Sequence, residues 1–390
     1  MNLDDSPEQA AFRARVRGWL AGHAPAMDSP QAWVKDFGVR RGDEEEAFLQ
    51  KARAWQALIA SAGFAGVSWP VKFGGQGLSP VEELIYSQEE AKFGVTTETF
   101  DVGTKTIAPT IIEHCTDEQK ARYLGPMLRG EEIWCQLFSE PVAGSDLAGL
   151  RTRAVREGDH FVVNGQKVWT SGAHYSDYAM LIARTSPDKP KHQGLTCFIV
   201  DMRTPGIEVR PLRQMTGATH FNEVFLENVV IPAENVFEAV DAGWRVINTC
   251  LAAERAIIGG GHRGPSFDQL RDLWRASSAR LPAHRDALVD AYIGEQVLEL
   301  LDMRIQTALT RGTEHLAETS VKKLYHGTVI NRTARLGNVL QDTVEAMTDD
   351  ERAYWHGEVL RVPLFRIAGG TDEIQRNILA KRVLHLPTAK

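Results

Sequence analysis

One glutamate falls on the apolar face of a helix predicted in the C-terminal half of the chain. Ile247, Cys250, Leu251 and Ile258 recur at the spacing of a helical stripe, and Glu254 lies on the same stripe. Burying a carboxylate is costly unless it is paired, and desolvation raises its pKa towards the range of a general base at neutral pH. Glu254 is therefore a candidate catalytic base, and a structural ion pair with an arginine is the alternative.

Two further stretches combine small, hydroxyl and aromatic residues at predicted turns. Residues 137–146 (LFSEPVAGSD) follow a predicted strand and offer backbone N–H groups and hydroxyls to an anion or a flat polar ring. Residues 169–172 (WTSG) place a large aromatic ring before two hydroxyls. Taken alone, the first stretch predicts an ordinary turn and the second a tryptophan packed inside a barrel.

A third stretch, residues 368–376 (AGGTDEIQR), begins with two glycines that allow a close backbone approach. Asp372 and Gln375 fit a capping box that opens a helix. A helix N-terminus also favours an electron-rich ligand. Taken alone, the stretch predicts a helix start.

Composition excludes several classes of protein. The net charge of −7 argues against nucleic-acid binding, which usually needs a basic excess. The four cysteines are far apart, which disfavours a zinc site and predicts reduced, mostly buried thiols. No apolar run approaches the roughly 20 residues of a membrane span. The acidic, polar first ten residues differ from a secretory signal, so we expect a cytoplasmic protein that binds no metal.

The elements that would position these stretches fall into three regions. Residues 1–130 show helical periodicity, residues 131–235 show short strands, and residues 236–390 return to helical periodicity. Because strands and helices do not alternate, a doubly wound dinucleotide-binding sheet is disfavoured. The pattern predicts an α+β fold of a helical domain, a small barrel or sandwich, and a helix bundle.

Local signals place single elements within these regions. Ser6 followed by Pro7 starts a helix. Asn164 and Gly165 supply the two positive-φ residues of a type I′ turn, which predicts a hairpin between 161–163 and 166–169. The other predicted helices are 44–62, 80–93, one from 117, 285–310 and 319–340, and the other predicted strands are 178–183, 196–200, 207–212 and 224–231.

Taken together and in this order, the stretches resemble the acyl-CoA dehydrogenase family. Residues 139–146 (SEPVAGSD) resemble its T/S-E-P-x-A-G-S-D loop, and residues 164–169 (NGQKVW) resemble its N-G-x-K-x-W segment. Residues 370–376 (GTDEIQR) resemble its G-T-x-E/Q-I-Q-R segment, and residues 69–75 (WPVKFGG) its W-P-x-x-F-G-G loop. The resemblance covers nearly the whole chain. It implies an N-terminal helical domain (1–130), a middle β-barrel (131–235) and a C-terminal four-helix bundle (236–390).

The resemblance also implies FAD as the cofactor and gives roles to the matching positions. Phe138 and Ser139 would line the flavin ring, Trp169 would pack on it, and Ser171 would bond near its N5. In the C-terminal segment, Thr371 and Glu373 would hold the phosphate and ribose region of the cofactor, and Ser145 of the first loop would contact the acyl-CoA.

The implied reaction is the α,β-desaturation of an acyl-CoA thioester, which needs a carboxylate to remove the α-proton. Many members carry that base in a Y-E-G-T segment, but this chain has Gly369 at the matching position. A smaller set places the base on the bundle helix in a Glu-Arg pair, and Glu254-Arg255 matches that arrangement. We therefore expect Glu254 to be the base and Arg255 to bind substrate.

Other departures widen the range of expected partners. The segment that usually contacts the FAD pyrophosphate is not recognisable in residues 263–285. The altered segments resemble a bacterial branch that acts on bulky acyl-CoAs, including steroid side chains, and that includes heterotetramers. We expect an electron-transfer flavoprotein as acceptor and a homodimer, homotetramer or heterotetramer. The alternatives are a non-catalytic partner subunit and a flavin oxidase or monooxygenase of the same fold.

Overall fold

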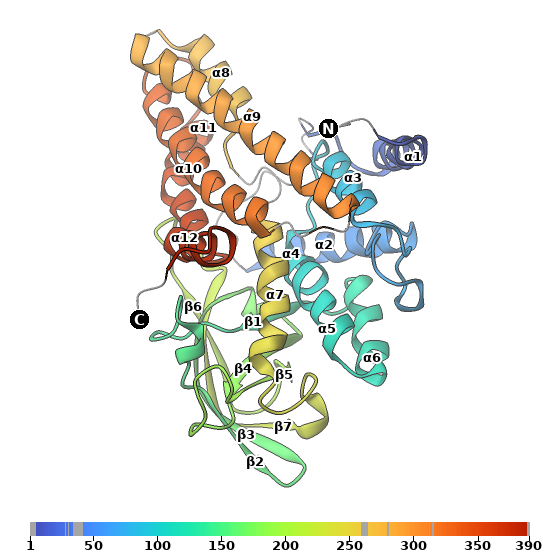
Figure 1. Cartoon of the computed structure of the whole chain (residues 1–390). Coiled ribbons are helices and arrows are strands. Elements are labelled where there is room, and N and C mark those ends of the chain that lie inside the picture. The colour runs from blue at the N-terminus through green and yellow to red at the C-terminus, as the bar shows by residue number, and fades with distance from the viewer. Residues whose placement is uncertain are drawn as a thin grey trace. The chain divides into compact units, whose positions relative to one another are not determined.

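The computed structural model describes residues 5–27, 29, 31–33, 42–258, 264–278, 281–311, 313 and 316–387. The chain divides into two compact units, Asp5–Glu254 and Arg255–Lys390. The first unit combines helices with a β-sheet, and the second is built from helices (Figure 1). Helix α7 (Gly243–Ile258) carries the chain from the first unit into the second.

Three helices of the first unit begin at capping boxes, at the predicted starts 7, 80 and 117. Ser6 and Ser79 each form a capping box just before a proline, and Thr116 forms a third. These caps confirm the predicted helix starts. Glu89 is fully buried and pairs with arginines of the first helix. The helices are α1 (Pro7–His23), α2 (Asp43–Ser61), α3 (Pro80–Glu90), α4 (Glu98–Asp101), α5 (Ala108–His114) and α6 (Asp117–Leu128), with a π-helical turn η2 (Val102–Ile107) between α4 and α5.

A seven-stranded sheet follows these helices and confirms the β character of the middle region. The strand order is β1-β4-β2-β3-β7-β6, and β5 pairs with β4. One apolar cluster of this sheet includes Phe161, Val163, Phe198, Val224 and Ile231, all buried. The strands are β1 (Trp134–Leu137), β2 (Arg153–Glu157), β3 (His160–Ser171), β4 (Tyr178–Arg184), β5 (Leu195–Asp201), β6 (Ile207–Leu212) and β7 (Phe221–Pro232).

The predicted hairpin turn at Asn164-Gly165 is wrong. Both residues lie inside the continuous strand β3, where the pairing with β7 shifts register between Val163 and Gly165. Asn164 and Gly165 therefore lie at a β-bulge within the strand. A Cβ on Gly165 would lie 2.7 Å from the Cα of Thr152, so the glycine permits close backbone contact instead of a turn. The reversal lies between β2 and β3, where Gly158 has a φ of +64°.

The second unit is a helix bundle, as predicted. Leu270, Leu336, Leu340 and Trp355 belong to one of its apolar clusters. Gly337 lets the ring of Trp355 approach α10, because a Cβ there would lie 2.0 Å from the ring. After α7, the helices are α8 (Phe267–Ala276), α9 (Pro282–Thr310), α10 (Leu316–Gln341), α11 (Asp349–Arg361) and α12 (Asp372–Ile378).

Four cysteines are unpaired and buried, as the sequence predicts: Cys115, Cys135, Cys197 and Cys250.

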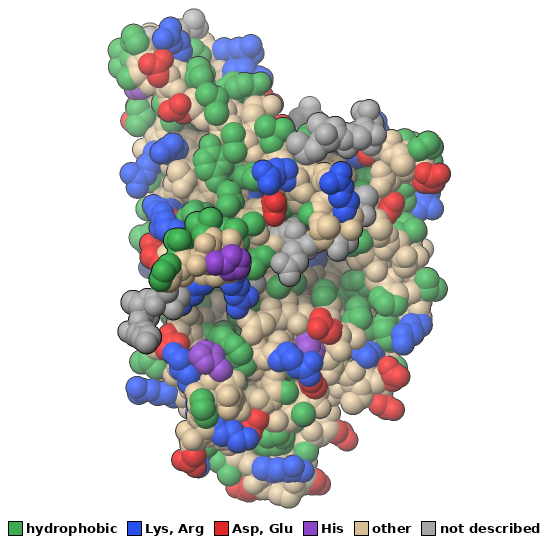
Figure 2. Space-filling view, viewed as in Figure 1, with side chains coloured by type: hydrophobic (Ala, Val, Ile, Leu, Met, Phe, Trp, Pro, Cys, Tyr) green, Lys and Arg blue, Asp and Glu red, His purple; other side chains and the backbone are tan. Residues whose placement is uncertain are grey.

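Acidic and basic side chains are interspersed across the face of the molecule shown in Figure 2. Among the described residues, no His, Cys, Asp and Glu side chains gather in a group that could hold a metal ion. In the same part of the chain, no helix is both long enough and apolar enough to cross a membrane.

Candidate functional site

Helix α7 carries the candidate base. Val246, Ile247 and Cys250 are fully buried, and Glu254, one turn after Cys250, is half-buried. Because residues four apart share a helix face, Glu254 lies on the face of α7 that packs into the first unit. The buried face of α7 therefore matches the predicted apolar stripe as far as Glu254. The side chain of Arg255 and the glycines 259–261 lie outside the described residues.

Contacts from β1 and α5 fix α7 in place. The Gln136 amide of β1 donates to Cys250 Sγ at 3.2 Å and to Thr106 Oγ1 at 3.3 Å. His114 of α5 forms a hydrogen bond of 2.9 Å with Thr249 Oγ1 of α7. Burial, followed by the nearby charge of Glu254, raises the pKa of the Cys250 thiol to about 12. Glu254 thus lies one helical turn beyond a direct contact between α7 and β1.

The π-helical turn η2 brings Thr106 to this contact. The N–H of Ala108 donates to the carbonyl of Gly103, five residues back, which is the π-helical pattern. Pro109 has no N–H to donate to the fourth preceding carbonyl, which favours a wider turn just before it. Sequence reasoning missed both η2 and Gln136, although a proline inside a helical pattern is a usable signal.

The loop after β1 is held by a buried ion pair. Glu140 accepts hydrogen bonds from Arg151 N at 2.7 Å, Thr152 N at 2.9 Å and Lys167 Nζ at 2.9 Å. Lys167 also donates to the Phe138 carbonyl at 2.9 Å. These bonds join the loop to the start of β2 and to β3. Glu140 and Lys167 are therefore positioning residues that sequence reasoning did not single out.

Burial and charge act in opposite directions on this pair. Burial lowers the pKa of Lys167 to about 8, although the charge of Glu140 opposes the shift. Burial also acts to raise the pKa of Glu140, but the Lys167 charge and the hydrogen bonds from Thr152 and Arg151 outweigh it and lower that pKa. Glu140 is therefore held ionised inside the protein.

The same loop places Phe138 and Ser139 beside the strand that carries Trp169. The N–H of Val168 donates to the Ser139 carbonyl at 2.8 Å, so Ser139 lies next to the chain neighbour of Trp169. Phe138 is buried and Ser139 is half-buried. Ser145 is exposed at the far end of this loop.

Trp169 turns out of the sheet at a second irregularity of β3. The pairing with β7 shifts register between Lys167 and Thr170, and Trp169 has a φ of +62°, which bulky residues rarely adopt. Its side chain is 59% exposed and meets Phe221 edge-on, with ring centroids 5.9 Å apart. The expectation that this tryptophan packs inside the barrel is therefore wrong, because the bulge points the ring outwards.

In the second unit, Thr371 is the N-cap of α12 and accepts from Ile374 N at 3.3 Å. The predicted capping box of Asp372 and Gln375 is therefore wrong by one residue. Gln375 instead donates to the Gly369 carbonyl at 2.9 Å. Asp372 is buried and accepts from Arg366 Nε at 2.7 Å, Lys323 donates to the Gly370 carbonyl at 2.5 Å, and Glu373 is exposed.

Comparison with known proteins identifies the family. Three models match in succession: the acyl-CoA dehydrogenase N-terminal domain at residues 6–131, the middle domain at residues 135–229 and the C-terminal domain at residues 241–384. The chain belongs to the acyl-CoA dehydrogenase family. Members of this family are flavin-dependent oxidoreductases of lipid metabolism, so the chain is an oxidoreductase and FAD is its cofactor.

Individual relatives agree with this placement. The chain is 42% identical over 338 residues to acyl-CoA dehydrogenase FadE34 of Mycobacterium tuberculosis. The aligned region covers 85% of this chain but only 46% of FadE34. It is 36% identical to acyl-CoA dehydrogenase IpdE1 of the same organism, over 96% of this chain and 97% of IpdE1.

Two solved structures have the same fold. The Tcur3481-Tcur3483 steroid acyl-CoA dehydrogenase matches with a TM-score of 0.82 and 27% identity over the whole of both chains. The ChsE4-ChsE5 complex of Mycobacterium tuberculosis matches with a TM-score of 0.80 and 27% identity, again over the whole of both chains. Relatives of this acyl-CoA dehydrogenase family member therefore include a heteromeric complex.

The first unit contains side chains suited to a flavin. Trp169 offers an exposed planar ring for stacking, and Ser171 offers an exposed hydroxyl two residues later. Thr170 Oγ1, between them, is buried and has no hydrogen-bond partner among the described atoms. A heteroaromatic ring with polar edges fits this combination, so the residues present fit FAD.

Proposed function

We propose that this chain desaturates the α,β-bond of an acyl-CoA thioester and that Glu254 is the base. The observation that carries the proposal is the continuous path of contacts within the first unit. Glu254 follows Cys250 on α7, Cys250 contacts Gln136 of β1, and β1 leads into the loop beside Trp169. The Glu254 carboxylate and the exposed ring of Trp169, to which we assign flavin stacking, are thus both linked to β1.

In this proposal, Glu254 removes the α-proton of the thioester as a carboxylate and becomes a carboxylic acid. The bound FAD supplies the hydride acceptor for the β-hydrogen. Half-burial of Glu254 supports the role, because limited solvation brings a carboxylate closer to the basicity that the α-proton requires. Gly369 has a φ of +66° and no side chain, so the position where many relatives carry the base cannot supply one here.

The other predicted site residues would contact FAD or the substrate. Trp169 would stack on the flavin, and Ser171 would donate to it near the hydride-accepting atom. Phe138 and Ser139 would line the ring from the loop that Lys167 holds. Thr371 and Glu373 of the second unit would contact the phosphate and ribose part of FAD, while Ser145 and Arg255 would bind the substrate.

Anaerobic flavin bleaching tests the proposal. Short, long, branched and steroid acyl-CoAs are added one at a time to the wild-type protein, and at least one of them should reduce the flavin and bleach its absorbance band. Glu254→Gln should keep the flavin spectrum and lose bleaching by about 10³-fold or more, because the proton acceptor is gone. Glu157→Gln, an exposed carboxylate on β2, is the matched control and should bleach like wild type. Bleaching of Glu254→Gln at the wild-type rate would contradict the assignment.

We propose a bulky acyl chain, such as a steroid side chain, as the substrate class. Two observations support this choice: the match to a solved steroid acyl-CoA dehydrogenase and the loss of the usual base position at Gly369. An electron-transfer flavoprotein is the acceptor we propose. The four unpaired cysteines support a reducing compartment such as the cytoplasm.

A second candidate function is that of a non-catalytic subunit that completes the FAD site of an unlike chain. The glycine at position 369 and the similarity to a chain of the ChsE4-ChsE5 complex favour it. Purification of the chain alone separates the two candidates. A colourless protein that takes up flavin only with a co-expressed partner would support the second candidate, and a yellow protein that bleaches by itself would exclude it.

A further inference from the structure

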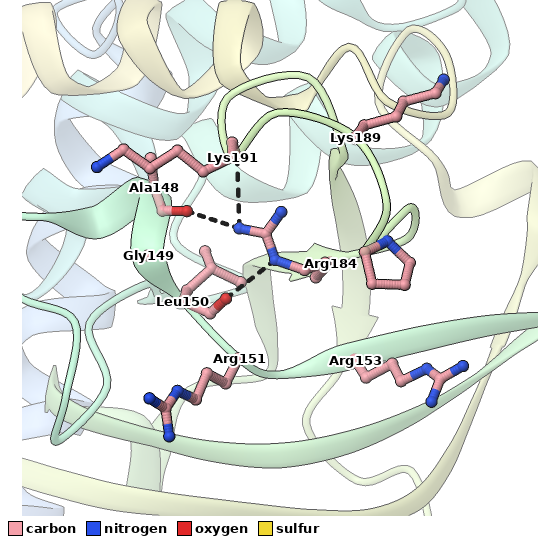
Figure 3. A pocket seen from close by; sticks show the side chains of 9 residues that line it. Ala148, Gly149, Leu150, Arg151, Arg153, Arg184, Lys189 and Lys191 are labelled. Carbon is pink, nitrogen blue, oxygen red and sulfur yellow. Dashed lines mark hydrogen bonds between the residues drawn. The ribbon is translucent and has the colours of Figure 1, made fainter.

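Cationic side chains hold loops of the first unit by donating to backbone carbonyls. Lys167 donates to the Phe138 carbonyl in this way. Arg184 donates to the carbonyls of Ala148 at 2.6 Å and Leu150 at 3.2 Å, as Figure 3 shows. The basic pocket around Arg184 in that view is also lined by Arg151, Arg153, Lys189 and Lys191. The second unit repeats the arrangement at the loop that leads into α12.

Lys323 of α10 is the cation that holds this second loop. It is 1% exposed, and its Nζ donates to the Gly370 carbonyl at 2.5 Å. Gln375 of α12, which packs against α10 (Figure 1), donates to the Gly369 carbonyl at 2.9 Å. Side chains from two helices therefore fix the carbonyls of two successive residues.

These two bonds decide which way the N–H groups of the loop point. In a planar trans peptide, the carbonyl and the N–H of the following residue point in opposite directions. Because the Gly369 and Gly370 carbonyls face buried side chains, the N–H groups of Gly370 and Thr371 point away from those side chains. Neither N–H has a hydrogen-bond partner among the residues that the structure describes. Both donors are therefore available to a ligand.

The loop also contains negative charge that a cation must offset. Asp372 is buried, its Oδ2 accepts from Arg366 at 2.7 Å, and its Oδ1 has no partner among the described atoms. Burial lowers the pKa of Lys323, and the charges of Asp372 and Glu373 oppose that shift, so both carboxylates lie within electrostatic reach of the ammonium. Without Lys323, an anionic ligand would approach the loop beside two carboxylates and a single cation.

We infer that Lys323 is a positioning residue of the cofactor site, which holds the loop so that Thr371 faces the phosphate part of FAD. The inference rests on the proposed function, which assigns this contact to Thr371. Lys323 acts in two ways. Its bond to Gly370 turns the Thr371 N–H towards the ligand, and its charge offsets the carboxylates of the loop. Because its side chain is buried, it acts through the loop.

The neighbouring lysine provides a matched control. Lys322 is 4% exposed and pairs with Asp302 of α9 rather than with the loop. Lys322→Met and Lys323→Met therefore each remove one buried ammonium from the same turn of α10. Only Lys323→Met removes a contact to Gly370. A difference in cofactor binding between the two variants thus reports the loop contact and not a general loss of bundle stability.

Flavin fluorescence titration of the FAD-free protein is the first measurement. Lys323→Met should weaken FAD binding about tenfold or more, while Lys322→Met should stay within about twofold of wild type. Lys323→Gln keeps an amide donor without the charge, so it should lose less affinity than Lys323→Met and gives the same test if that variant melts early. Equal losses in the two methionine variants, or no loss in either, would overturn the inference. A chain that takes up FAD only with a co-expressed partner is titrated as that complex.

Hydrogen exchange of the FAD-free full chain separates this inference from the proposed function, because it needs neither flavin nor acyl-CoA. The hydrogen-bonded amides of Ala368 and Gln375 lie on either side of the loop. They should exchange about tenfold faster in Lys323→Met and at the wild-type rate in Lys322→Met. Unchanged exchange in Lys323→Met, or faster exchange with unchanged FAD affinity, would contradict the role of Lys323. A wild-type protein that binds FAD through this loop but bleaches with no acyl-CoA would contradict only the proposed activity.

Discussion

Replacing Lys167 with methionine should uncouple the loop after β1, which we propose lines the flavin, from the sheet. Lys167 is fully buried, and its ammonium contacts both the Glu140 carboxylate and the Phe138 carbonyl at 2.9 Å. Methionine keeps much of the length of the side chain but removes the charge and the donors. Glu140 would then keep only the backbone donors of Arg151 and Thr152, and the Phe138 carbonyl would lose the bond to this side chain.

The expected loss of stability is large because the remaining carboxylate stays buried. Removing one partner of a buried ion pair costs about 3–5 kcal/mol. For a unit of this size, each kcal/mol lowers the melting temperature by about 2–4 °C, so Lys167→Met should melt roughly 10 °C below wild type. Because the Lys167 charge lowers the pKa of Glu140, that pKa should rise in the variant. At acidic pH the Glu140 carboxyl of the variant would then be protonated and uncharged, so the stability difference from wild type should be smaller there than at neutral pH.

Thermal and urea unfolding of Lys167→Met, Glu140→Gln and the double variant measure this coupling. The double variant should lose less than the sum of the single variants by about 2 kcal/mol, because neither residue then leaves a charge unpaired. Flavin retention after gel filtration should fall in Lys167→Met, since Phe138 and Ser139 lie on the released loop. A melting temperature within about 2 °C of wild type, with flavin retention unchanged, would refute the reasoning.

Three further variants test other features. Gly165→Ala should destabilise the protein by roughly 2–3 kcal/mol in urea unfolding, because its Cβ would lie 2.7 Å from the Thr152 Cα. Glu89 has a pKa lowered from 4.5 to about 2, chiefly by the hydrogen bond from Arg17, so its folded pKa is below its unfolded value. The stability it contributes is therefore present above pH 4.5 and lost as the pH falls towards 2, and Glu89→Gln should flatten the acid limb of a pH-dependent unfolding curve. Trp169→Ala should weaken FAD binding about tenfold or more in a flavin fluorescence titration while lowering the melting temperature by less than about 3 °C, because the ring is 59% exposed.

Local signals predicted most of the secondary structure. The Ser6-Pro7 pair predicted the start of α1, and the ranges predicted from residues 80 and 117 match α3 and α6, which Ser79 and Thr116 cap in the structure. Helical periodicity likewise indicated that Glu254 shares a face with buried Cys250. These features depend on neighbours in sequence, so the sequence alone contains the information.

The irregularities of β3 depend on a strand about sixty residues away. Asn164-Gly165 is a strong hairpin signal, but pairing with β7 continues past it and turns it into a bulge. The outward rotation of Trp169 arises from the same pairing. The ion pair of Glu140 with Lys167 and the basic pocket around Arg184 also join residues that are distant along the chain. Their residue types were visible in the sequence, but their proximity was not.

The burial of every native thiol makes the folded chain a clean background for chemical labelling. Burial raises the pKa of Cys115, Cys135 and Cys250 to about 12 and that of Cys197 well above its usual value. Alkylating reagents attack the thiolate, which these groups do not form at neutral pH. A single cysteine introduced at an exposed position such as Arg156 would therefore take up a maleimide dye selectively, without removal of the native cysteines.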